Sequence, residues 1–171
     1  MKIVALDLSL TRSGFATSED YSGVLRPPKG YDAGMLRLGW IREAVLAIAE
    51  DADLVVVEGY SYGSKGRAVV NIGELGGVIR LAFYDAGIPY VEVPPSSLKR
   101  FATGKGNADK DSVLAAAIRR LDYDGHYHDE ADALFLLEMA RTHYDLPCTP
   151  MPKAHIDALD GVRWPELTVN A

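Results

Sequence analysis

The chain has 171 residues, of which 48% are hydrophobic and 25% charged, and a formal net charge of −6. This composition is typical of one soluble globular domain and excludes a disordered or fibrous protein. The single cysteine, Cys148, excludes an internal disulfide, and no apolar stretch approaches the roughly 20 residues of a membrane-spanning helix. No signal peptide follows Met1, so we expect a cytoplasmic protein.

The charge is unevenly distributed along the chain. Residues 60–110 carry a net charge of +3, whereas residues 121–171 carry −7. This polarity is compatible with a basic surface for a polyanion beside an acidic site that a metal ion neutralises. Random scatter over a solvated surface is the alternative.

The first third of the chain reads as strands followed by a helix. Residues 2–9 form an apolar run typical of a buried strand, and residues 14–17 continue it as an antiparallel neighbour. Residues 21–30 contain two adjacent prolines and are predicted as a loop or a short edge strand. Helical spacing of apolar residues predicts a helix over 35–49, and the apolar run at 53–58 predicts a second buried strand.

Helices and strands then alternate. The pattern predicts a helix over 68–84, a strand over 90–93 and a short helix over 98–102 with Ser97 as its cap. After a loop with two glycines, a helix begins at Asp109 or Lys110 and ends near residue 121. The last predicted helix covers 129–143.

Prolines dominate the end of the chain. Pro147, Pro150, Pro152 and Pro165 predict that residues 145–171 form an extended or poorly ordered tail. The order of the preceding elements, strands first and then alternation, predicts an α/β fold with a mixed central sheet flanked by helices.

Two carboxylates stand at the ends of apolar strands. Asp7 follows the apolar run 3–6, and Glu58 closes the run 54–57. Burying an ionised carboxylate costs several kcal/mol unless a cation or hydrogen bonds compensate. Since several acids at one place would repel one another, a divalent metal is the common remedy.

Asp129 and Asp132 are three residues apart in the first turn of a predicted helix, so they share one face. Three of the four acids have a structural alternative. Asp129 could be a helix cap, Asp132 a partner of the helix dipole, and Glu58 an ordinary loop acid. Oxygen ligands without a cysteine or histidine cluster favour Mg²⁺ or Mn²⁺ over zinc. Acid-lined two-metal sites characteristically perform phosphoryl displacement, so we expect a metal-dependent enzyme.

The sequence resembles the RuvC-type Holliday-junction resolvases, which have the ribonuclease H-like fold. The resemblance covers residues 1–144 and implies a nuclease domain there, with metal ligands at Asp7, Glu58, Asp129 and Asp132 and two Mg²⁺ ions that Mn²⁺ can replace. It rests on Ile3-Val4-Ala5-Leu6-Asp7 followed by Gly14-Phe15, on Val55-Val56-Val57-Glu58, and on His128-Asp129-Glu130-Ala131-Asp132-Ala133-Leu134, which matches the pattern Asp-x-x-Asp-Ala-Leu.

A pair of lysines strengthens the resemblance. Lys99 and Lys110 are eleven residues apart and flank the Gly104-Lys105-Gly106 loop, as the family's two functional lysines do. A phosphate ligand would rationalise a lysine at a helix start, and both side chains are expected to steady charge at the scissile phosphate. The expected DNA-contacting residues are Lys99, Arg100, Lys105, Lys110, Lys65, Arg67, Tyr60 and Tyr62.

The chain also departs from the family pattern. The family places a wedging aromatic residue three positions after the strand-end glutamate, where this chain has Ser61 between Tyr60 and Tyr62. Either tyrosine could stack on an unpaired base, and a core or dimer contact is the alternative. His128 could assist a metal or the leaving group, or belong to a linker.

The resemblance implies a homodimer that nicks two opposed strands of a four-way junction. Gly76-Gly77 within the predicted helix suggests close packing, against a second subunit or against the chain's own sheet.

Forks, flaps or RNA are the alternative substrates. An actin-like or sugar-kinase ATPase is disfavoured because that architecture needs two such domains and a glycine-rich phosphate hairpin, which this chain lacks. No nucleotide cofactor is therefore expected. An idle DNA-binding module is disfavoured by the four intact acid positions.

Overall fold

The computed structural model describes residues 1–60, 67–146 and 149–167, and only the backbone of residues 67–69. Within these residues one mixed sheet has the strand order β3-β2-β1-β4-β5. β1 pairs antiparallel with β2 and parallel with β4, as predicted for a mixed sheet. The strands are β1 (Ile3–Asp7), β2 (Ser13–Thr17), β3 (Ser22–Leu25), β4 (Leu54–Glu58) and β5 (Tyr90–Val93).

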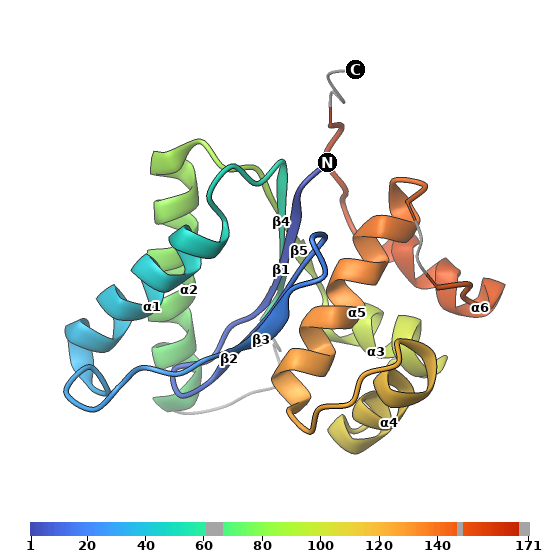
Figure 1. The fold of residues 1–171 in the computed structure, drawn as a ribbon, viewed down its shortest axis with the longest axis horizontal. Coiled ribbons are helices and arrows are strands. Elements are labelled where there is room, and N and C mark those ends of the chain that lie inside the picture. The colour runs from blue at the N-terminus through green and yellow to red at the C-terminus, as the bar shows by residue number, and fades with distance from the viewer. Residues whose placement is uncertain (61–66, 147–148, 168–171) are drawn as a thin grey trace.

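Helices cover both faces of this sheet (Figure 1), which confirms the predicted α/β architecture. α1 (Gly34–Ile48) and α2 (Arg67–Ala86) lie on one face. The other face carries α3 (Pro95–Thr103), α4 (Lys110–Arg120), α5 (His128–His143) and the short α6 (Lys153–Ile156).

Side-chain alternation along the central strands creates two cores, one on each face. Ile3 and Ala5 pack with the α3–α5 layer, whereas Val4 and Leu6 pack with the α1–α2 layer. Because successive strand residues point to opposite faces, Asp7 continues the row of Ile3 and Ala5 toward α5. The same parity brings Glu58, two residues after the α5-facing Val56, to that face.

The helix at Pro95 differs from the sequence prediction. α3 begins at Pro95 with Pro94 as its N-cap, so Ser97 lies inside the first turn and is not the cap. Proline is favoured at the first helical position, where its missing N–H is not needed. Residues 21–30, predicted as a loop or a short edge strand, form a strand only over β3. The other predicted helices and strands between residues 2 and 143 agree with the structure to within two residues at each end.

Residues 145–171 were predicted to be extended or poorly ordered, but residues 153–161 within this segment are helical. α6 is followed by a 3₁₀ helix, η1 (Asp157–Gly161), and Leu159 is buried in the core on the α5 face. The His155 ring bonds the carbonyl oxygen of Phe101 through Nδ1 at 2.6 Å, and the Trp164 ring stacks on His143. Pro152 is the N-cap residue of α6, so this proline precedes a helix and does not prevent packing.

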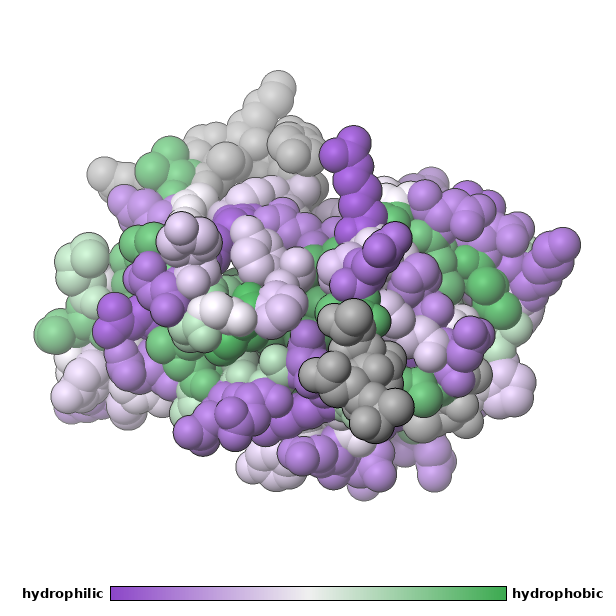
Figure 2. Space-filling model, turned by 90° about the horizontal axis from the view of Figure 1, so that it is seen from above, coloured by the Kyte–Doolittle hydropathy of each residue, from purple (hydrophilic) through white to green (hydrophobic). Residues whose placement is uncertain are grey.

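Among the described residues, no helix is long and apolar enough to cross a membrane. Seen from above (Figure 2), the surface is a mixture of hydrophilic and hydrophobic patches.

Candidate active site

Asp7 and Glu58 are brought together by strand pairing. β1 and β4 are parallel neighbours, and the register pairs Leu6 with Val57, so both strands end at the same edge of the sheet. In open α/β sheets, binding sites form beyond the carboxyl ends of the strands. The two acids therefore stand where the fold places a ligand.

A glycine allows α5 to carry its acids onto this edge. Gly14 lies opposite Asp7 in the antiparallel β1–β2 pair. A Cβ at this position would stand 1.8 Å from the backbone carbonyl oxygen of Asp129, so the first turn of α5 rests directly on the backbone of β2. This close approach explains why position 14 is a glycine, and it brings Asp132 next to Asp7.

The result is a cluster of three acids, which we call the carboxylate cluster: Asp7, Glu58 and Asp132. One oxygen from each lies within 4.8 Å of the other two. Burial, followed by the charges of Glu58 and Asp132, raises the pKa of Asp7 well above its usual value. Burial and then the charge of Glu58 raise the pKa of Asp132 to about 7. The cluster is therefore hard to ionise without a cation.

The donor set of the carboxylate cluster fits a divalent cation. Among the described residues, no lysine or arginine forms an ion pair with any of the three acids. The available donors are carboxylate oxygens, which suit Mg²⁺ and similar hard cations.

Asp129, the fourth acid of the resemblance, lies beside the carboxylate cluster and not within it. Its Oδ2 accepts a hydrogen bond from Nε of Arg12, and its Oδ1 lies 3.9 Å from Nζ of Lys110. Its role as a metal ligand remains a prediction. Arg12 was not among the predicted site residues, because an arginine in the β1–β2 turn shows no local sign of a partner 117 residues away.

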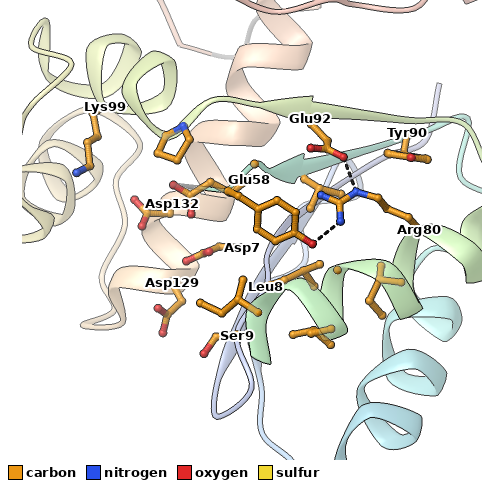
Figure 3. A pocket seen from close by; sticks show the side chains of 18 of the residues that line it. Asp7, Leu8, Ser9, Glu58, Arg80, Tyr90, Glu92, Lys99, Asp129 and Asp132 are labelled. Atoms are coloured by element: carbon orange, nitrogen blue, oxygen red, sulfur yellow. Dashed lines mark hydrogen bonds and ion pairs between the residues drawn. The ribbon is translucent and has the colours of Figure 1, made fainter. Parts of the chain in front are cut away.

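The two predicted lysines reach the same place as the acids. Lys99 and Lys110 line a cleft of about 370 Å³ together with the carboxylate cluster. Figure 3 shows the carboxylates gathered between Lys99 on one side and Arg80 on the other. The fold thus brings the lysines of α3 and α4 and the acids of β1, β4 and α5 to one cleft.

Except for Tyr60, the other predicted DNA contacts lie outside the cleft or outside the described residues. Arg100 and Lys105 are exposed at the end of α3 and do not line the cleft. Tyr62 and Lys65 are outside the described residues, as is the side chain of Arg67.

Tyr60 lines the cleft but is held by a neighbour. Nη1 of Arg80 donates to the Tyr60 hydroxyl, Nε of Arg80 donates to Glu92, and the guanidinium lies 4.5 Å from the centre of the Tyr60 ring. A Cβ at Gly76 would stand 1.7 Å from the Tyr60 hydroxyl oxygen, so that glycine makes room for the ring. We call Tyr60, Arg80 and Glu92 the tyrosine clasp; Arg80 and Glu92 were not among the predicted site residues.

His128 is committed to a structural contact. Its Nε2 lies 2.9 Å from Oδ1 of Asp111, which ties the first turn of α5 to the first turn of α4. Asp109 caps α4 by accepting a hydrogen bond from the backbone N–H of Ser112. These contacts fix Lys110 and Asp132 relative to each other.

Comparison with known proteins supports the expected fold and family. The family model described as crossover junction endodeoxyribonuclease RuvC matches residues 30–143. The RuvC of Synechococcus sp. (strain CC9311) is 31% identical over 156 residues, covering 78% of this chain and 94% of the relative. The RuvC of Anaeromyxobacter sp. (strain K) is 34% identical over 150 residues, covering 85% and 80% respectively.

Solved structures show the same fold. Thermus thermophilus RuvC matches with a TM-score of 0.66 at 19% identity, covering 88% of this chain and 100% of that one. The same protein in complex with a Holliday junction substrate matches with a TM-score of 0.68. The ribonuclease H-like fold is confirmed, and the chain belongs to the RuvC family of crossover junction endodeoxyribonucleases.

Proposed function

We propose that this chain is a divalent-metal-dependent endonuclease that resolves four-way DNA junctions by paired, symmetric nicks. The observation that carries the proposal is the carboxylate cluster, in which Asp7 and Asp132 are buried and Glu58 is partly buried. Among the described residues these acids have no basic partner, and they share one cleft with Lys99 and Lys110. Membership of the RuvC family supplies the class of substrate.

In this proposal the acids of the cleft bind metal and its lysines bind the phosphate. Asp7, Glu58 and Asp132 would hold the metal, with Asp129 beside them as the fourth ligand of a two-ion site. The chemistry that Mg²⁺, or Mn²⁺ in its place, would supply when bound there is activation of a water and stabilisation of the leaving oxygen. Lys110 and Lys99 attract the scissile phosphate and steady its added charge. Burial of Asp7 among apolar strands fixes the direction of its carboxylate.

A homodimer is part of this proposal, because paired nicks need two active sites related by a two-fold axis. One face of α2 presents apolar side chains to solvent: Val70, Leu81 and Tyr84 are 61%, 60% and 80% exposed. Gly73 and Gly77 have open space around the position of a Cβ. Their spacing puts all five on one stripe of the helix, which suits close packing against a second copy of α2.

Broader cleavage of forks, flaps or RNA is the second candidate function. It is favoured by the tyrosine clasp, since Arg80 covers one face of the Tyr60 ring and fixes its hydroxyl. Tyr60 in this position cannot act as a free wedge at a junction centre. Ser61, at the family's wedge position, lies outside the described residues.

A cleavage assay separates these functions. End-labelled four-way junctions, forks, flaps, duplex DNA and an RNA–DNA hybrid are incubated with the chain in Mg²⁺, Mn²⁺ or EDTA. Symmetric nicks on the junction that need metal and are lost in Asp132→Asn support resolution. Equal rates on forks and flaps support the broader nuclease, and metal-independent or absent cleavage of all substrates contradicts both.

A further inference from the structure

Two arginines from separate turns meet on one aromatic ring beside the active site. Arg12 lies in the β1–β2 turn, Arg26 directly follows β3, and Tyr127 is the N-cap residue of α5. Each guanidinium carbon lies 4.9 Å from the centre of the Tyr127 ring. The two cations are therefore within about 10 Å of each other, held by cation–π contacts.

The charge of this group is only partly balanced. Arg12 is paired with Asp129. Arg26 is exposed, and among the described residues its guanidinium has no hydrogen bond or ion pair, only the contact with Tyr127. The charges of Arg12, Arg26 and Asp129 add up to a net positive charge, and the contacts with Tyr127 hold both guanidinium groups in place. A planar guanidinium of this kind suits a phosphate group, which it can bind through two parallel N–H bonds.

The arginines extend the basic surface of the cleft. Arg12 and Lys110 approach different oxygens of the Asp129 carboxylate, so this acid lies between them. Positive groups thus run from Lys110 past Asp129 to Arg12 and on to Arg26. A nucleic acid strand whose scissile phosphate lies at the carboxylate cluster would continue along this line.

We propose that Arg12 and Arg26, held on Tyr127, form a second phosphate-binding site that grips the DNA backbone beside the scissile phosphate. The inference rests on the proposed function and names a contact of the same substrate. The competing explanation is that the stack only joins the β3 exit to the start of α5.

Arg26 is the residue to test, because it is exposed and makes no contact with a metal-site acid. Arg26→Glu and Arg26→Ala are compared with Arg42→Glu, the same charge change on α1. The Arg42 side chain is exposed and, among the described residues, forms an ion pair only with Glu43. Junction affinity is measured by fluorescence anisotropy over a range of salt concentrations, in an Asp132→Asn background that leaves the junction uncut.

A phosphate contact predicts about tenfold weaker binding for Arg26→Ala, a larger loss for Arg26→Glu, and a salt-dependence slope reduced by about one. Arg26→Lys keeps the charge and should retain the slope. A merely structural stack would leave the slope unchanged. Arg26→Glu behaving like Arg42→Glu contradicts the inference alone, whereas a wild-type chain that neither binds nor cuts junctions contradicts the inference and the proposed function together.

Discussion

The two ends of the cleft handle charge in opposite ways. In the carboxylate cluster, three acids lie together without a basic partner among the described residues. In the tyrosine clasp, Arg80 is paired with Glu92 and also donates to the Tyr60 hydroxyl. Both ends are built on the carboxyl ends of strands, since Glu58 ends β4 and Glu92 belongs to β5.

This difference in charge balance indicates that the carboxylate cluster is a binding site, whereas the tyrosine clasp has a structural role. A group of like charges costs folding free energy until a ligand neutralises it, so the carboxylate cluster is poised to bind a cation. The clasp is already neutralised and gains nothing from a metal. Substitutions in the two places should therefore have different signs on stability and different sizes on activity.

Loss of one cluster acid should have the largest effect on activity. Asp132→Asn removes a metal ligand without changing the shape of the side chain, and junction cleavage should fall by roughly a thousandfold or more, about 4 kcal/mol of transition-state stabilisation. Single-turnover cleavage in Mg²⁺ measures it. Asp124→Asn, an exposed acid just before α5, is the control and should cleave like wild type; equal rates for both variants would remove Asp132 from the site.

Displacing α5 should have the next largest effect. In Gly14→Ala the new methyl group meets the Asp129 carbonyl oxygen, so the first turn of α5 must shift away from β2. We expect cleavage to fall about a hundredfold and the free energy of unfolding to fall by about 2 kcal/mol. Urea unfolding and the cleavage assay check this.

Gly39→Ala is the matched control for Gly14→Ala. Gly39 lies in α1 with open space around the position of a Cβ. Alanine there should leave activity unchanged and stabilise the helix slightly. Gly14→Ala with full activity would show that α5 does not need this close approach.

Breaking the clasp should have the smallest effect. Arg80→Met leaves Glu92 and the Tyr60 hydroxyl without their partner, and we expect a loss of about 1 kcal/mol in stability and less than tenfold in cleavage. Thermal unfolding with and without Mg²⁺ should show the same metal-induced increase as in wild type. If that increase disappears, the clasp belongs to the metal site after all.

The strand acids could be predicted because each stands at the end of a local apolar pattern. Asp7 and Glu58 close runs whose period of two fixes their face, and Asp132 follows from its helical spacing. Asp129 could not be placed with the same certainty, since its partner Arg12 is 117 residues away. Pairings over such distances depend on the sheet order, which local patterns do not contain.

The C-terminal segment shows the same limit. Its prolines predict breaks in regular structure. The contacts of His155 with α3 and of Trp164 with α5 join residues far apart in the sequence, so no local pattern predicts them. Gly76 was recognised as unusual, yet the ring that fills its space, Tyr60, comes from the end of a different element.

The central claim, that the carboxylate cluster is a cation site, predicts how stability depends on pH. The pKa of Asp132 is about 7 in the folded chain and near 4 in an unfolded one, so the folded state binds more protons between these values. The contribution of this group to stability is therefore full below about pH 4 and is lost as the pH rises through 7. Between pH 5 and 8 the loss amounts to about 3 kcal/mol.

The most direct measurement is urea unfolding of the metal-free chain and of Asp132→Asn at pH 5 and pH 8, with and without Mg²⁺. We predict that metal-free wild type loses stability toward pH 8, that Mg²⁺ restores it there, and that Asp132→Asn loses less and gains less from Mg²⁺. Stability that is the same at both pH values in wild type and variant, and unchanged by Mg²⁺, would contradict the claim.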